Sequence, residues 1–111
     1  MMKEKLQEIQ TLIKNLQQNA PEETKNFFEF LKSVEKDGAV SAKNKELINI
    51  ALAVAAQCEW CIAFHTQNAI KLGATKEEIV EAGMQAVLMH GGPALMYLTP
   101  LFNAIEEFGN E

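Results

Sequence analysis

Two cysteines and a histidine are the side chains in this sequence whose spacing best suits chemistry. Cys58 and Cys61 form a Cys-x-x-Cys pair, and His65 follows Cys61 by four residues. Residues four apart on a helix lie on one face, so the imidazole can reach the Cys61 sulfur and take its proton. A cysteine paired with a base in this way supplies thiolate near neutral pH. The pattern predicts a redox-active thiol centre.

Two different effects favour thiolate at the two sulfurs. Cys58 lies nearest to the start of the expected helix, whose partial positive charge stabilises a thiolate. The imidazole favours Cys61 and also supplies directed proton transfer, so we assign the attacking role to Cys61 and the resolving role to Cys58. Cys58 precedes Cys61 by three residues on the same face, which is close enough for a disulfide if the first helical turn is regular or slightly distorted.

Glu46 is a further candidate, as a proton relay or as the residue that orients His65. It lies fifteen residues before Cys61, and an unbroken helix would separate the two by roughly 22 Å. Glu46 therefore joins the site only if the chain reverses direction near Gln57 and Cys58. The alternative is an ordinary solvated helix residue.

Other interpretations of the same residues remain open. Both cysteines could be small buried hydrophobic residues, and His65 a satisfied core histidine. Cys58, Cys61 and His65 could also bind zinc, with His90 or Glu46 as a fourth ligand. The sequence has no second Cys-x-x-Cys and no His-x-x-x-His, so we expect neither a metal nor a cofactor.

Composition excludes several classes of partner. The net charge is −5 and the chain contains no arginine, so we expect no nucleic-acid partner and favour a neutral substrate over a strongly anionic one. The N-terminus lacks the apolar stretch of a signal peptide, and the most apolar run, residues 47–56, is too short to span a bilayer. We therefore expect a cytoplasmic protein without a membrane partner, in which a close cysteine pair indicates redox chemistry more often than a structural disulfide.

The elements that must position these residues are helical. Apolar periodicity, caps and helix breakers predict an all-α fold in one domain, residues 1–111, with about six helices. The expected helices cover about residues 3–19, 21–37, 42–57, 59–72, 76–90 and 93–108. Thr75 and Glu78 form a capping box, and Pro100 should kink or interrupt the last helix.

Helical spacing also suggests which faces are inward. In the second helix the expected apolar face comprises Phe27, Phe28, Leu31 and Val34. In the third helix the expected inward residues are Leu47, Ile48, Ala51, Leu52 and Ala55. Trp60 is expected to be a packing residue or a screen over the thiolate, and His90 a residue at a helix C-terminus or an interface.

One long stretch carries no charge. Residues 82–105 contain no Asp, Glu, Lys or Arg across two expected helices. A small monomer normally leaves one face of each helix wet and charged. We therefore expect a homo-oligomer in which this stretch is buried against another subunit; a central helix pair within a monomer is the alternative.

The motifs together resemble a known family. Glu46 followed by Cys58-x-x-Cys61-x-x-x-His65 is similar to the signature of the alkylhydroperoxidase D-like, or carboxymuconolactone decarboxylase, family. The segments 68–79 and 91–93 resemble the continuation of that signature, so the likeness covers about residues 40–108. Alkylhydroperoxidase D itself has a further histidine between its cysteines, where this chain has Glu59 and Trp60.

The resemblance implies an alkylhydroperoxidase D-like helical domain that assembles as a trimer or hexamer. It implies a thiol peroxidase in which Cys61 attacks a hydroperoxide, Cys58 resolves the product, His65 and Glu46 relay protons, and an external dithiol reduces the disulfide. A lactone-decarboxylating lyase is an alternative, although those family members generally lack the cysteine pair. A non-enzymatic oligomer that senses redox state is another.

Overall fold

The computed structural model describes residues 1–109 of the chain, and these residues contain helices and no strand. The helices are α1 (Met2–Asn19), α2 (Pro21–Glu35), α3 (Ala42–Ala55), α4 (Glu59–Lys71), α5 (Lys76–His90), α6 (Gly92–Met96) and α7 (Leu98–Gly109). The predicted all-α fold is confirmed. None of the described helices combines the length and the apolar character needed to cross a membrane.

Local sequence explains most of the helix boundaries. Ser41 caps α3 by accepting a hydrogen bond from the Asn44 N–H at 3.1 Å. The predicted capping box at the start of α5 is present, because Thr75 and Glu78 bond to each other's backbone N–H groups. The helix expected over residues 93–108 is divided at Tyr97 into α6 and α7. Pro100 therefore lies in the first turn of α7, where its missing N–H costs no helical hydrogen bond.

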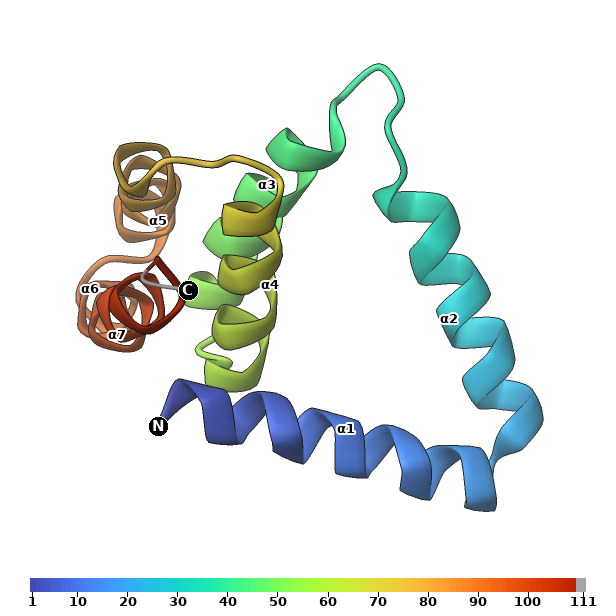
Figure 1. Ribbon diagram of the computed structural model, residues 1–111. Helices are drawn as coiled ribbons and strands as arrows, with labels where there is room; N and C mark the ends of the chain where they lie inside the picture. The colour runs from blue at the N-terminus through green and yellow to red at the C-terminus, as the bar shows by residue number, and fades with distance from the viewer. Residues whose placement is uncertain (110–111) are drawn as a thin grey trace.

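The core lies among α3, α4, α5 and α7, with the first turn of α1 packed against it. Figure 1 shows α3 and α4 side by side, with α5, α6 and α7 covering one of their sides. The fully buried large side chains are Ile50, Val54, Ile62, Thr66, Ile79, Leu101 and Phe108. The cysteine-bearing α4 thus has neighbours in α1, α3 and α7, which fix its position.

The predicted inward face of α3 is wrong at Ile48 and Leu52, whereas Leu47 and Ala55 pack against the core as expected. Ile48 and Leu52 are 51% and 61% exposed, whereas the buried residues are Ile50, Ala53, Val54 and Glu46. From Ile50 to Ala55 this helix is apolar on every side, so periodicity could not identify the face that packs. The observed orientation has a functional consequence, because it turns Glu46 toward the interior.

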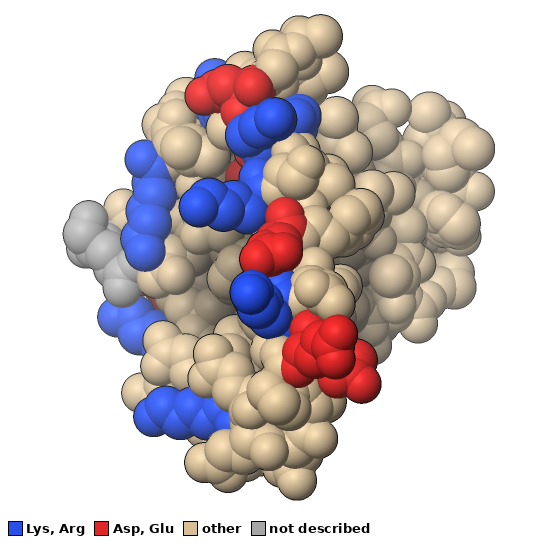
Figure 2. All heavy atoms as spheres, turned by 90° about the vertical axis from the view of Figure 1, so that its right-hand side faces the viewer, with Lys and Arg blue, Asp and Glu red and all other residues tan. Residues whose placement is uncertain are grey.

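Helices α1 and α2 form an arm that extends from the body (Figure 1). Only Thr24 is buried in α2, and the apolar residues expected to pack are largely exposed, with Phe27 at 56% and Val34 at 49%. In Figure 2, which faces this arm, charged side chains gather on part of the surface and leave a broad region without charge. The apolar face of α2 is therefore real but has no cover within a single chain.

Candidate active site

A reversal of the chain builds the site. Helix α3 ends at Ala55, Gln57 adopts the left-handed conformation with φ of 58°, and α4 begins at Glu59. The Cys58 N–H donates to the Ala53 carbonyl at 3.1 Å, which closes the turn. The predicted reversal near residues 57 and 58 is thus present, and it lays α3 against α4 (Figure 1).

Cys58 and Cys61 are joined by a disulfide at the start of α4. Their Cα atoms are 5.3 Å apart, within the range that a disulfide requires. Cys58 is the N-cap residue, and its sulfur accepts a hydrogen bond from the Cys61 N–H at 3.2 Å. Both sulfurs therefore lie at the positive end of the α4 dipole, which stabilises thiolate in the reduced protein.

His65 and Glu46 meet across the hairpin. His65 Nδ1 lies 3.0 Å from Glu46 Oε1, and the two side chains are 19% and 5% exposed. The Asn49 amide donates to the same carboxylate oxygen at 2.7 Å. A carboxylate here makes Nδ1 the protonated nitrogen of a neutral ring and leaves the Nε2 lone pair free as a base. His65 lies one turn beyond Cys61 on α4, which places the two residues on the same face of this helix.

Opposing effects act on the charge of Glu46. Burial alone would raise its pKa, but hydrogen bonds from His65 and Asn49, the charge of His65 and a smaller contribution from Asn68 hold the pKa of this carboxyl below its usual value. Its other oxygen, Oε2, is buried without a hydrogen-bond partner in the described structure. A buried carboxylate with only part of its hydrogen bonding satisfied is costly, so its placement depends on the His65 pair.

Glu35, at the end of α2, is a neighbour that the sequence did not reveal. One carboxylate oxygen each of Glu35 and Glu46 and one ring nitrogen of His65 all lie within 4.8 Å of one another. Burial and the negative charge of Glu46 raise the pKa of Glu35, and the charge of His65 opposes this shift. No motif marks Glu35, because its position depends on how the turn after α2 folds back onto α3.

The residues between the two cysteines bind α1. The Trp60 indole N–H donates to Glu8 at 3.1 Å, and the Lys5 ammonium lies 4.7 Å from the centre of the Trp60 ring. Lys5 also approaches Glu59 at 4.0 Å. Trp60 is 46% exposed, and through these contacts it attaches α1 to the start of α4. His90 is the exposed last residue of α5 and is not among the residues that meet at the site.

The described residues bring one group of possible metal ligands together. The zinc alternative needs both thiolates, and in this oxidised form the disulfide occupies both sulfurs. Glu35, Glu46 and His65 offer three donors, but Nδ1 of His65 already bonds to Glu46. A closed structural site needs four ligands, so we assign no metal to this group.

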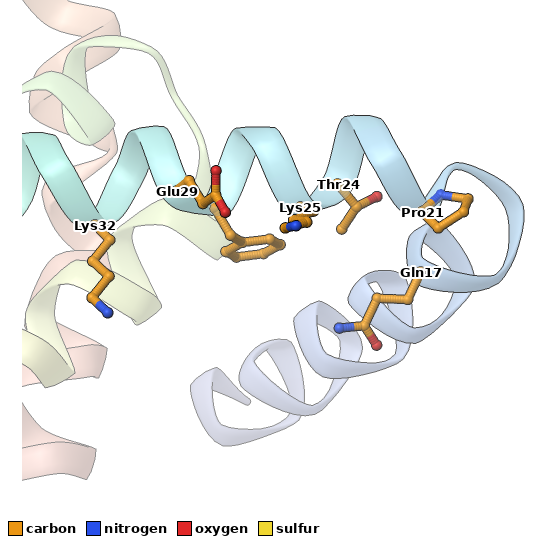
Figure 3. Close-up of a pocket in the computed structure, with 7 residues that line it drawn as sticks. Gln17, Pro21, Thr24, Lys25, Glu29 and Lys32 are labelled. Carbon is orange, nitrogen blue, oxygen red and sulfur yellow. The ribbon is translucent and has the colours of Figure 1, made fainter.

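A surface hollow on the arm of α1 and α2 is separate from these residues. It has a volume of about 440 Å³ and lies between the end of α1 and α2 (Figure 3). Its lining residues are Gln17, Pro21, Thr24, Lys25, Phe28, Glu29 and Lys32. The Thr24 hydroxyl in this hollow donates a hydrogen bond to the Ala20 carbonyl at 2.6 Å, so its proton is already used by the backbone. We therefore place the candidate site at the hairpin and not in this hollow.

Comparison with known proteins identifies the group to which this geometry is similar. Residues 21–104 match the profile of the carboxymuconolactone decarboxylase family. An uncharacterized protein of Cupriavidus necator is 38% identical over 96 residues, covering 86% of this chain and 85% of that protein.

Two solved structures are similar over nearly the whole chain. A family protein of Legionella pneumophila is 43% identical with a TM-score of 0.92, covering 96% of each chain. A family protein of Thermotoga maritima, suggested to take part in an antioxidative response, is 25% identical with a TM-score of 0.86, covering 96% of this chain and 91% of that one.

Replacing Glu46 with Gln should reveal how the His65 pair stabilises the protein. Because the pKa of Glu46 is lowered on folding, its contribution is present above the ordinary value of 4.5 and is lost as the pH falls through the lowered value. We expect Glu46→Gln to cost about 1–3 kcal/mol of unfolding free energy at neutral pH. Urea titrations at several pH values should show this difference shrinking below pH 4.5. Glu29→Gln, at an exposed position, is the control. A stability difference between parent and Glu46→Gln that stays constant down to about pH 3 would contradict a lowered pKa for Glu46.

Proposed function

The chain belongs to the carboxymuconolactone decarboxylase family, and from this premise we propose that it is a thiol-dependent peroxidase. The observation that supports the proposal best is the hydrogen bond between His65 and Glu46, one helical turn beyond a cysteine pair that forms a disulfide. The suggested antioxidative role of the Thermotoga maritima relative agrees with it.

The first step oxidises Cys61. The Cys61 thiol gives its proton to His65 Nε2, and the imidazolium that forms is stabilised by Glu46 through Nδ1–H. The thiolate attacks one oxygen of the hydroperoxide and the O–O bond breaks. His65 then returns the proton to the departing oxygen, which leaves as water or an alcohol, and Cys61 becomes a sulfenic acid.

The second step forms the disulfide. Cys58 attacks the sulfur of the sulfenic acid, its thiol proton goes to the departing hydroxide, and water is released. The N-terminal position of Cys58 on α4, together with the N–H that its sulfur accepts, favours the thiolate that this attack needs. An external dithiol supplies two electrons and two protons to restore both thiols.

The sequence departs from alkylhydroperoxidase D between the cysteines. Glu59 and Trp60 occupy the positions where that enzyme has a further histidine, and both contact α1 instead. The proposed proton relay to the cysteine pair therefore uses His65 and Glu46, without a further histidine between the cysteines.

Lactone decarboxylation is the competing reaction within the family. It does not use a thiol, so activity that persists after both cysteines are alkylated would favour it. A redox-sensing oligomer would instead show slow peroxide reaction together with a change of assembly on reduction.

We propose in addition that the protein acts as a homo-oligomer, a trimer or hexamer. The charge-free stretch leaves Leu88, Met89 and Met96 at 75%, 77% and 67% exposed in a single chain. Apolar side chains this exposed on neighbouring elements are typical of a surface that another subunit covers.

Stopped-flow mixing of the reduced protein with hydrogen peroxide and with an organic hydroperoxide tests the peroxidase. We expect Cys61→Ser to abolish the fast reaction and His65→Ala to slow it by about 100-fold or more, because it removes the general acid–base. Cys58→Ser is the matched control: it should react in the first step and stop at the sulfenic acid. Equal rates for Cys61→Ser and the parent would refute the mechanism.

Light scattering coupled to size exclusion tests the assembly. We expect the parent to have a trimeric or hexameric mass and Met89→Lys to dissociate, because the lysine would place an unpaired charge in the interface. Glu77→Lys, at the charged start of the same helix, should keep the parent mass. A monomeric parent would contradict the proposal.

A further inference from the structure

We propose that Glu35 is a positioning residue of this site: its carboxylate stabilises the imidazolium form of His65 and thereby the thiolate of Cys61. The inference rests on the proposed function only in taking Cys61 as the reacting sulfur. It adds a second carboxylate, from a different helix, to the pair formed by His65 and Glu46.

The geometry gathers three helices at one point. Glu35 is the last residue of α2, Glu46 lies on α3 and His65 lies on α4. One carboxylate oxygen of each glutamate and one ring nitrogen of His65 lie within 4.8 Å of one another. Glu35 is half-buried, and no ion pair among the described residues joins it to a lysine. When its ring is protonated, the His65 imidazolium is a cation close to this carboxylate.

A lysine holds Glu35 in this place. Lys45 Nζ donates to the Val34 carbonyl at 2.9 Å and to the Lys36 carbonyl at 2.6 Å, on either side of Glu35. The Ala42 N–H donates to Asp37 at 2.7 Å and closes the turn that leads to α3. The C-terminal end of α2 is thus fixed to the start of α3, although the rest of α2 stands away from the body (Figure 1).

The charges around Glu35 indicate how it acts on His65. The charged groups that act on Glu35 are Glu46 from α3 and His65 from α4, and the Lys45 ammonium binds the backbone carbonyls on either side of it. Burial and Glu46 raise the pKa of Glu35, and the charge of His65 opposes this rise. The attraction is mutual, so an ionised Glu35 stabilises a charged imidazole. When the Cys61 proton moves to His65, two neighbouring carboxylates stabilise the product imidazolium instead of one. The thiolate form is favoured accordingly.

The pH dependence of Cys61 alkylation tests this inference. In a Cys58→Ser background Cys61 is the sole cysteine, and serine is a good N-cap in place of Cys58. The rate of reaction with iodoacetamide follows the thiolate fraction. We expect Glu35→Gln to move the midpoint of the profile upward by about one pH unit, because the His65 imidazolium loses one nearby opposite charge and then favours the Cys61 thiolate less.

Two further variants separate this effect from others. Glu29→Gln removes an exposed charge from the same helix and should leave the midpoint unchanged. Glu35→Asp keeps the charge and should have a midpoint close to that of the parent. A Glu35→Gln profile that coincides with the parent overturns the inference, as does an equal shift in Glu29→Gln. If peroxide reacts with none of these proteins while the alkylation shift persists, the peroxidase proposal fails and the role of Glu35 stands.

Discussion

The hydrogen bond between His65 Nδ1 and Glu46 Oε1 is the interaction on which the site depends. It joins two helices that meet only because the chain reverses at Gln57, and it offsets the cost of burying a carboxylate with one unsatisfied oxygen. The same bond selects the ring tautomer with a free Nε2 lone pair, which is the base toward Cys61 in the proposed peroxidase. Stability and chemistry thus share one contact, so replacing Glu46 should affect both.

The rest of the fold serves to keep this contact in place. Helix α4 is enclosed by α1, α3 and α7, and the two residues between the cysteines tie its first turn to α1. The arm formed by α1 and α2 is attached at both ends, near the cysteines through Trp60 and near Glu46 through Lys45. Its exposed apolar side chains lie between these attachments. In the proposed oligomer a second subunit covering them would support both ends of the site.

The sequence predicted the helices well because their signals are local: Ser41 and Thr75 act as caps, and Pro100 accompanies a break near its position. It also predicted that Cys58, Cys61, His65 and Glu46 belong together, from one-turn spacing and the family resemblance. It placed Ile48 and Leu52 of α3 wrongly, because the C-terminal half of this helix is apolar nearly all round and gives periodicity little to detect. It missed Glu35 because contacts between helices depend on the turn at residues 36–41, which brings α2 back onto α3.

Nitrogen-15 NMR of ring-labelled His65 in the disulfide form tests the central claim most directly. In the pH range where the ring is neutral, the account predicts a proton on Nδ1 and a free lone pair on Nε2. It also predicts that Glu46→Gln weakens this preference. A neutral ring that carries its proton on Nε2, or one unaffected by Glu46→Gln, would show that Glu46 does not orient His65 and would contradict the account.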